Sequence, residues 1–295
     1  MWVKPWNIKE GFLIGGGLLF AGILLQAAVG PFRWELFAFP VSLIMLLLLL
    51  YVVGMMYAFR RRVYAFEWMM HAGAAVPCLV YAAFLTILMG LLPQVSVGGM
   101  PWLSQMLRFW PFVLVWTWMM LISALAALNH LLRWKVREIP FILNHLGVAI
   151  AVVAATLGSA DKQSLQLTAF TGEPQWRTVD EKGILHKPGL TIQLHKFTLE
   201  EYADGTPKRF ASDITVYVED GNAVRGTVEV NKPLKVNGWK IYQYGYDVNS
   251  GSNSAYSVFQ LVRDPWLPWV YLGIFMMIAG ALCLMLLMAP KPVKA

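Results

Sequence analysis

Three histidines lie inside strongly apolar stretches of this sequence, where ionisable side chains are rare and usually face a bundle interior or a cofactor. They are His71, His130 and His145. An imidazole is the usual axial ligand of haem iron, and two imidazoles from different helices can hold one haem between them. The pattern therefore indicates a haem b site built from at least one histidine pair. The alternative is that each imidazole reaches the membrane interface or hydrogen-bonds a neighbouring backbone.

The composition indicates what kind of protein must position these histidines. Of the 295 residues, 58% are hydrophobic and 14% are charged, whereas a soluble domain averages about 25% charged residues. The chain is therefore expected to be a membrane protein. Its two cysteines, Cys78 and Cys283, lie in apolar runs, where a thiol behaves as a small hydrophobic group. Two cysteines are too few for a disulfide-stapled fold or a cysteine-rich metal site.

Six stretches reach the roughly 20 apolar residues that a helix needs to cross a bilayer, and they are residues 11–29, 36–58, 69–92, 111–132, 140–159 and 267–289. The sequence thus predicts a polytopic α-helical membrane protein with six transmembrane helices. A long polar segment separates the fifth helix from the sixth. It divides the chain into a five-helix region at 1–159, a separate domain at 160–266, and a last helix with a short tail at 267–295.

Basic residues in the short loops predict the orientation, because Lys and Arg near a span are retained in the cytoplasm. With a cytoplasmic N-terminus, ten basic residues lie inside, while the short outside loops hold only Arg33 and Arg108. Both termini are then cytoplasmic, and segment 160–266 lies outside a bacterial inner membrane. All three histidines fall near the cytoplasmic leaflet. The basic rim meets anionic membrane lipid, and the pattern does not indicate nucleic-acid binding.

Between residues 164 and 263 the apolar runs give way to the alternation of half-buried strands, as at Ile214 and Val216. Asn237-Gly238 lies between two such runs and is a strong hairpin signal, because both turn residues must tolerate positive φ. The segment is therefore expected to be a small antiparallel β domain of five to seven strands. By the assigned orientation, this domain is extracytoplasmic, or periplasmic, and lies between helices 5 and 6.

Two features of this β domain bear on its function. Tyr242, Tyr244 and Tyr246 are expected to share one face of a strand, either as a recognition surface or as ordinary cross-strand neighbours. His186 and His195 have no second ligand at metal spacing and are expected to be ordinary surface or strand residues. The sequence shows no nucleophile with a paired base, no phosphate loop and no acidic metal cluster. No catalytic residue is therefore assigned.

Two further segments suggest contacts made by the helices. Residues 93–110 carry apolar side chains at i, i+4 spacing, with Pro101 suited to a first helical position. We expect a short amphipathic helix there, either as an aromatic interface anchor or as a partner-docking surface. Gly11 and Gly15 are expected to let another helix approach the first span closely. That helix belongs either to this chain or to a partner.

The segments at 141–159, 228–247 and 261–284 resemble motifs of the ResB-type, or CcsB-type, cytochrome c biogenesis proteins. FILNHLGVAIAVVAATLGS at 141–159 is similar to the histidine-bearing span that precedes the family's extracytoplasmic domain. VEVNKPLKVNGWKIYQYGYD at 228–247 resembles the family's N-x-P-L…G-W-x-I-Y-Q segment, and LVRDPWLPWVYLGIFMMIAGALCL at 261–284 resembles its closing D-P-x-L-P-x-V-Y-x-G span. The family histidine maps onto His145 only. Family members usually have a larger extracytoplasmic domain and fewer spans before it.

The resemblance implies a haem-handling subunit of a membrane cytochrome c synthetase, a non-catalytic part of a cytochrome c haem lyase complex. The tryptophan-rich haem-presenting motif of the ResC/CcsA-type partner is not recognisable here, so that partner would be a separate polypeptide. Haem would enter from the cytoplasmic side, cross the membrane and be presented outside to the CxxCH motif of an apocytochrome c. We expect His145 and His71 to be axial ligands of the haem iron, with His130 as a further cofactor-binding candidate.

Two other classes of function stay open at this stage. A cytochrome b-like electron-transfer subunit would also hold haem between two histidines, but two stacked haems need four ligands and the spans contain three histidines. A membrane assembly factor would need no cofactor. A stable haem spectrum in the purified protein would exclude this second class.

Overall fold

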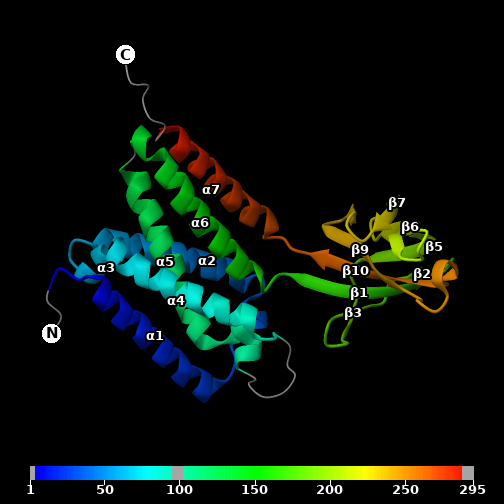
Figure 1. Ribbon diagram of the computed structural model, residues 1–295, viewed down its shortest axis with the longest axis horizontal. Helices are drawn as coiled ribbons and strands as arrows, with labels where there is room; N and C mark the ends of the chain where they lie inside the picture. The colour runs from blue at the N-terminus through cyan, green and yellow to red at the C-terminus, as the bar shows by residue number, and fades with distance from the viewer. Residues whose placement is uncertain (1–3, 95–101, 134, 288–295) are drawn as a thin grey trace, which may run out of the picture. The chain divides into compact units, whose positions relative to one another are not determined.

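The computed structural model describes residues 4–94, 102–133 and 135–287 (Figure 1). The chain divides into two compact units. The helical unit comprises Met1–Asp161 and Trp266–Ala295, and the β unit comprises Lys162–Pro265. Each is described by itself below.

Six helices of the helical unit are long and apolar enough to cross a membrane. Their bounds are α1 Ile8–Val29, α2 Val41–Phe59, α4 Ala72–Leu91, α5 Trp110–Leu132, α6 Ile139–Gly158 and α7 Leu267–Leu287. Four short elements join them: the 3₁₀ helices η1 Trp34–Phe37, η2 Leu103–Arg108 and η3 Val136–Glu138, and the α-helix α3 Tyr64–Trp68. The expected six membrane helices are therefore present. The short helix α3 has a number of its own, so the fifth membrane helix is labelled α6, and the strands follow it in the chain.

Two of the expected spans begin later in the structure than the apolar pattern suggested. Residues 36–40 form the end of η1 and a turn, and α2 starts directly after Pro40. Residues 69–71 form a turn between α3 and α4. Apolar runs continue through both turns, so hydrophobicity alone places the span but not the first residue of its helix.

Glycines bring α1 close to α4. A Cβ atom added to Gly11 would overlap the backbone carbonyl of Gly73, and one added to Gly15 would overlap the ring of Tyr81. The Tyr81 hydroxyl in turn donates a hydrogen bond to the carbonyl of Phe12, at 2.9 Å. The helix that approaches Gly11 and Gly15 is therefore α4 of the same chain.

Helices α6 and α7 lie side by side in Figure 1 and are also joined through glycines. A Cβ atom on Gly147 would lie 2.6 Å from the carbonyl oxygen of Gly273. A Cβ atom on Gly280 would lie 2.5 Å from the side-chain nitrogen of Asn144. Small residues permit this close approach of backbones within a membrane. One face of α6 is therefore fixed against α7, and its other faces are available to line a site.

Asp161, after the end of α6, joins three segments of the helical unit. Its carboxylate accepts hydrogen bonds from the backbone N–H of Phe39 at 2.5 Å, the hydroxyl of Ser42 at 2.8 Å and the indole N–H of Trp266 at 2.6 Å. Ser42 is fully buried. The start of α2, the end of α6 and the approach to α7 are thus held by one side chain.

The segment between α4 and α5 forms the 3₁₀ helix η2 in its described part. Met106 in η2 is fully buried, and the indole N–H of Trp110 donates to the carbonyl of Gly30 at 3.0 Å. This part of the expected amphipathic helix therefore packs on its own chain. Pro101, the expected first helical residue, lies outside the described residues.

The β unit is a sandwich of two antiparallel sheets. The first sheet has the strand order β4-β3-β1-β10-β9-β8, and the second has the order β2-β5-β6-β7. The strands are β1 Gln163–Phe170, β2 Pro174–Gln175, β3 Thr178–Val179, β4 Leu185–His186, β5 Leu190–Glu201, β6 Pro207–Val218, β7 Ala223–Glu229, β8 Leu234–Val236, β9 Trp239–Tyr246 and β10 Tyr256–Arg263. The unit has ten strands where five to seven were expected, and six of the ten have seven or more residues. The two-residue β2, β3 and β4 are too short to produce an alternating pattern.

The alternation expected for the β unit is present in its core. The side chains of Ile214 and Val216 in β6 are fully buried, together with Phe259 of the other sheet. Between β8 and β9, Asn237 and Gly238 have φ values of 46° and 79°. Both residues of the tight turn thus adopt the left-handed conformation that the hairpin signal requires.

Candidate functional site

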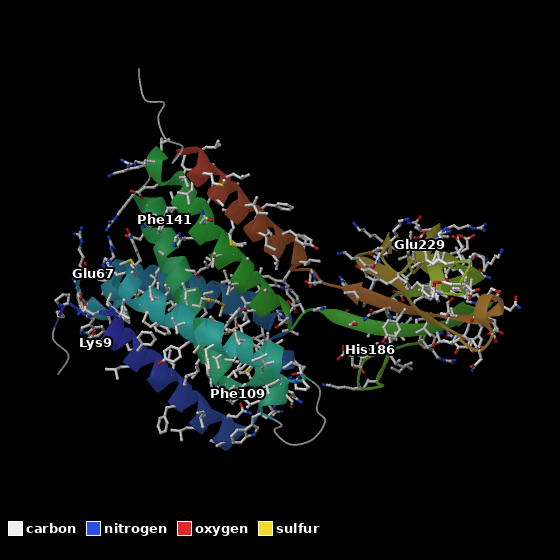
Figure 2. The ribbon with its side chains drawn as sticks, viewed as in Figure 1. Lys9, Glu67, Phe109, Phe141, His186 and Glu229 are labelled. Atoms are coloured by element: carbon white, nitrogen blue, oxygen red, sulfur yellow. The ribbon has the colours of Figure 1, made fainter. Side chains whose placement is uncertain are left out.

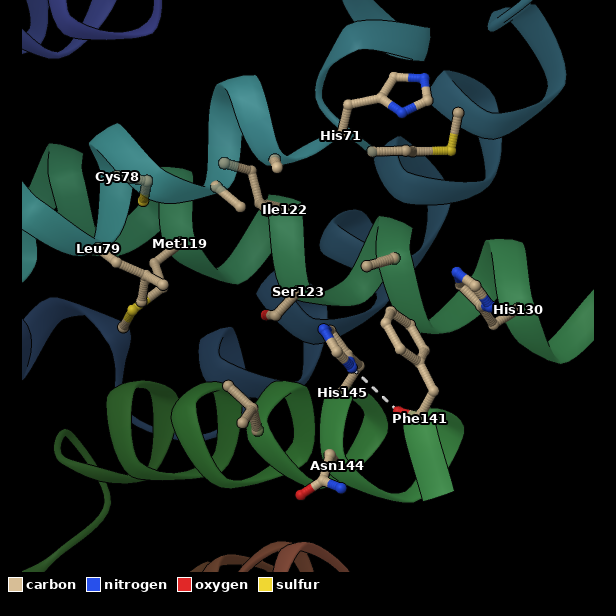
Figure 3. Close-up of a pocket in the computed structure, with 15 residues that line it drawn as sticks. His71, Cys78, Leu79, Met119, Ile122, Ser123, His130, Phe141, Asn144 and His145 are labelled. Atoms are coloured by element: carbon tan, nitrogen blue, oxygen red, sulfur yellow. Dashed lines mark hydrogen bonds between the residues drawn. The ribbon is translucent and has the colours of Figure 1, made fainter. Parts of the chain in front are cut away.

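The three membrane histidines line one cavity of the helical unit. This cavity has a volume of about 500 Å³, and His71, His130 and His145 contribute to its wall (Figure 3). Most other lining side chains are apolar or contain sulfur, among them Met119 and Cys78. A cavity of this size and polarity lies within the range of small-molecule and cofactor sites. The sequence therefore selected three residues that the fold brings together.

Direction and position along the helices explain this convergence. His71 immediately precedes α4, His130 is in the last turn of α5, and His145 is in the second turn of α6. Because α5 runs in the opposite direction to α4 and α6, all three positions fall at the same end of the bundle. Figure 2 places Lys9 near the start of α1 and Glu67 in α3 at the same end of the helical unit.

His71 lies outside its helix rather than a few residues inside the third span, as the apolar pattern suggested. Its φ and ψ of −111° and 160° are extended, and it occupies the N-cap position of α4. The carbonyl of His71 accepts hydrogen bonds from the N–H groups of Ala74 and Ala75. Among the described residues, no hydrogen bond or ion pair involves its imidazole. No contact among the described residues therefore competes with a ligand for either ring nitrogen of His71.

His145 is held by its own helix. Its Nδ1 lies 3.0 Å from the carbonyl oxygen of Phe141, one turn earlier in α6 (Figure 3). A carbonyl can only accept a hydrogen bond, so this contact places the N–H on Nδ1 and leaves the lone pair on Nε2. That tautomer is the one a metal-binding histidine needs, and a hydrogen bond at the second nitrogen is usual for such ligands.

His130 has a carboxylate partner. Its Nδ1 lies 2.8 Å from Oε2 of Glu138, at the end of η3, and both side chains are about 70% buried, with exposed fractions of 29% and 28%. The imidazole ring also lies against the ring of Phe141, with 3.9 Å between ring centroids. The imidazole is therefore held both by a hydrogen bond to Glu138 and by an aromatic contact with Phe141.

Phe141 separates His130 from His145. Its ring stacks on the His145 imidazole at 3.6 Å between centroids and an interplanar angle of 13°, and its contact with His130 is described above. Figure 3 shows the phenyl ring between the two imidazoles, and His71 beside α4. In this arrangement an aromatic ring, and not open space, lies between the His130 and His145 imidazoles.

A bare metal ion is a poor fit to the described part of the chain. No group of three or more His, Cys, Asp or Glu side chains there lies close enough to hold one. Haem iron needs only two axial ligands from the protein, because the porphyrin supplies the other four. The apolar cavity with separated imidazoles therefore fits a porphyrin better than a coordinated ion.

The cysteines show no reactive arrangement in the structure. Cys78 is buried in the cavity wall, and its Sγ lies 4.0 Å from the carbonyl oxygen of Val115. Cys283 is partly buried in α7. Cys78 packs in an apolar cluster with Trp118 and Ile122, as expected of a small hydrophobic group.

The two histidines of the β unit have local polar partners. His186 Nε2 lies 3.0 Å from Oδ2 of Asp180, and this hydrogen bond lowers the pKa of the Asp180 carboxyl. His195 Nε2 lies 2.7 Å from the hydroxyl of Thr215 on the neighbouring strand. These are the contacts of ordinary surface and strand residues.

The expected single face of three tyrosines is wrong for Tyr246. A β-bulge interrupts the pairing of β9 with β10: Gln243 pairs with Phe259 and Gly245 with Val258, so Tyr244 is the extra residue. Such a bulge reverses the alternation beyond it. Tyr246 consequently packs on two aromatic rings of the second sheet, with centroids 4.9 Å from Phe197 and 5.3 Å from Phe210. Tyr244 remains 60% exposed.

Two residues of the site were not identified from the sequence. Glu138 precedes α6 by one residue and looks like an ordinary acidic residue at a helix start. Phe141 is one of many aromatic residues in an apolar stretch. The spacing of Phe141 and His145, four residues apart on one helix, was the available signal for their stacking.

A comparison with known families gives a match to part of the chain. The model of the ResB-like family matches residues 133–255, which include Glu138, Phe141, His145 and most of the β unit. The resemblance to ResB-type proteins is therefore confirmed for this region, which is less than half of the chain. His71, His130 and the closing span at 261–284 lie outside it.

Curated relatives align over a similar length. Cytochrome c biogenesis protein CcsB of Prochlorococcus marinus (strain NATL2A) is 31% identical over 102 residues, 35% of this chain and 23% of the relative. The protein of the same name from Synechococcus sp. (strain JA-2-3B'a(2-13)) is 27% identical over 113 residues, 37% of this chain and 24% of the relative. The chain thus matches about a quarter of the length of these relatives.

A solved structure of the cytochrome c heme lyase CcmF aligns with 98% of this chain and 47% of its own length. The identity is 15% and the TM-score is 0.41. A likeness at this level does not establish a common fold.

Proposed function

We propose that this chain is a haem-handling subunit of a membrane cytochrome c synthetase, needed for covalent attachment of haem to apocytochrome c outside the cytoplasm. The observation that carries the proposal is the single apolar cavity lined by His71, His130 and His145. The ResB-like match over residues 133–255 and the names of the CcsB relatives direct that haem chemistry to cytochrome c biogenesis rather than to electron transfer.

His71 and His145 are the proposed axial ligands of haem b. The His145 Nδ1 is occupied by the Phe141 carbonyl, so its Nε2 is free to bind iron. The His71 imidazole stands on a different element and has no described hydrogen bond that binding would break. Phe141 separates His145 from His130, which makes His71 the better partner for His145. Haem, when bound, supplies the vinyl groups that react with the client's cysteine thiols.

The orientation follows from the loop charges. The sequence assigns ten basic residues to the loops and tails on the His71 side of the spans, and two to the short loops on the opposite side. By the positive-inside rule, the haem cavity then opens near the cytoplasmic leaflet and the β unit is periplasmic. This chain provides the haem path and a docking surface. A separate ResC/CcsA-type partner presents the haem, and an apocytochrome c is the acceptor.

The proposal is tested by haem spectroscopy of the purified protein. The wild type should show the Soret and α bands of a low-spin haem b, and His71→Ala and His145→Ala should each lose low-spin haem. Imidazole in the medium should partly restore the low-spin spectrum to either variant, because it can fill a vacated axial position. The matched control is His186→Ala together with His195→Ala in the β unit, which should leave haem content at the wild-type level.

Three outcomes would contradict the proposal. Unchanged haem content and Soret position in both ligand variants would show that the ligands are elsewhere. Wild-type protein that carries no haem, and takes up none when haem is added, would favour a cofactor-free assembly factor. Loss of haem in the His186 and His195 control would move the site to the β unit.

A further inference from the structure

If His71 and His145 ligate the iron, His130 is not needed as an iron ligand. Its surroundings indicate a different role. Axial imidazoles of one haem approach the iron from opposite faces of the porphyrin. The Phe141 ring stacks on His145 and lies between it and His130. His130 nevertheless contributes to the wall of the same cavity. A haem in that cavity would therefore meet His130 at its edge rather than at its iron.

The partner of His130 indicates what it recognises. Nδ1 donates to the carboxylate of Glu138 at 2.8 Å. An imidazolium donates hydrogen bonds from both ring nitrogens, so the cationic form can join Glu138 on one side to a second anion on the other. Hydrogen bonds between ionised partners are about twice as strong as neutral ones. Glu138 also fixes the orientation of the ring before any ligand arrives.

The end of the cavity where His130 lies favours a negative ligand. His130 is in the last turn of α5, where the unpaired carbonyls of the helix favour cations and a protonated imidazole. Arg133, Lys135 and Arg137 follow within seven residues, and the backbone N–H of Arg133 already donates to the His130 carbonyl. The two propionates are the only ionised groups on the haem periphery, and they share one edge of the macrocycle.

We propose that His130 binds a haem propionate, and that Glu138 is a positioning residue that acts through His130. This inference rests on the proposed function and assigns a separate role within the same site: His71 and His145 hold the iron, and His130 holds the carboxylate edge at the cytoplasmic end of the cavity. The propionate edge of the haem then faces the basic end of the bundle.

The test compares two porphyrins that differ only at the propionates. Purified wild type and His130→Ala are stripped of haem and titrated with haem b and with haem b dimethyl ester, whose propionates are neutral. His130→Ala should weaken haem binding about ten- to hundredfold, the effect of losing one charge-assisted hydrogen bond. It should leave the affinity for the dimethyl ester within about twofold of wild type, because the ester offers no carboxylate to lose. The low-spin spectrum of the saturated variant should be unchanged.

Glu138→Gln provides a second variant that keeps the size of the side chain. It should weaken haem binding about threefold or more, again with no effect on the ester, because the ring is no longer held by a charged partner. Protein yield and thermal midpoint of the haem-free form show whether either variant is folded. If His130→Ala does not fold, His130→Leu, whose side chain has no hydrogen-bond donor, takes its place in the titration.

Each other outcome would overturn the inference. A high-spin spectrum in saturated His130→Ala would make His130 an iron ligand. If His130→Ala weakened the binding of haem and of the ester equally, His130 would only shape the cavity. If the variant bound haem as tightly as wild type, His130 would have no role in binding. Failure of the proposed function gives a different result, because wild type would then bind neither porphyrin with a low-spin spectrum.

Discussion

Asp161 should be the most sensitive polar residue at the end of the helical unit away from the histidines. Its carboxylate accepts three hydrogen bonds, from Phe39, Ser42 and Trp266. A hydrogen bond to a charged group contributes about 1.5–3 kcal/mol when buried. Asp161 is partly exposed and water can replace some of this, so we take about 1 kcal/mol for each bond. Asp161→Ala should therefore lower the free energy of unfolding by about 3 kcal/mol.

The assay is thermal unfolding of the purified protein in detergent, followed by tryptophan fluorescence. For a unit of this size, about 3 kcal/mol corresponds to a fall in the midpoint of about 6–12 °C. Asp161→Asn keeps one acceptor oxygen and should lose about half as much. The matched control is Asp220→Ala, an exposed turn residue of the β unit that accepts a hydrogen bond from the Asn222 N–H. It should move the midpoint by less than about 2 °C.

The reasoning would be refuted if Asp161→Ala unfolded at the wild-type midpoint. The fully buried hydroxyl of Ser42 would then have found another acceptor at no cost, and the carboxylate would not be what joins α2, α6 and α7. A fall of the same size in Asp161→Asn and Asp161→Ala would assign the effect to the charge rather than to the number of acceptors.

Two further predictions concern the β unit and the orientation. A cysteine at Asn222 should be labelled by an impermeant thiol reagent in cells with a permeable outer layer, and one at Val63 should not. The reason is that basic loops are retained in the cytoplasm. The reverse labelling pattern would invert the proposed direction of haem transport. Tyr246→Ser should destabilise the β unit by about 2 kcal/mol, since its ring packs on Phe197. Tyr244→Ser should leave both stability and protein abundance unchanged and lower cytochrome c maturation with haem still bound; normal maturation would exclude the exposed tyrosine as a docking residue.

The sequence predicted those features whose cause is local. Each membrane helix is a continuous apolar run, and its presence follows from length alone. The β8–β9 hairpin followed from Asn237-Gly238, because few other residues accept the φ values of 46° and 79° found there. The convergence of the three histidines also followed, since their distance from each span end and the antiparallel course of α5 fix their depth.

Features that depend on pairing between distant residues were not predicted. The bulge at Tyr244 arises from the register of β9 against β10, and the sequence of β9 alone does not predict it. The pairing of His130 with Glu138 crosses the turn between α5 and α6, and its geometry depends on the path of that turn. Such contacts decide which face Tyr246 occupies and which nitrogen of His130 is free. They therefore decide the roles proposed for Tyr246 and His130, although the strand and the helix that carry these residues were predicted.

The attachment of the proposed ligands differs in a way that suits a carrier of haem. His145 stands on α6, whose opposite side is fixed against α7 through Gly147 and Gly273, so its position is set by rigid helix contact. His71 stands in the turn between α3 and α4, outside the helical hydrogen-bond ladder. A resident cofactor is best held by two rigid ligands, whereas haem in transit must also leave. If both histidines hold haem as proposed, His71, which lies in a turn, would dissociate first, and His145 on its rigid helix would keep the porphyrin oriented.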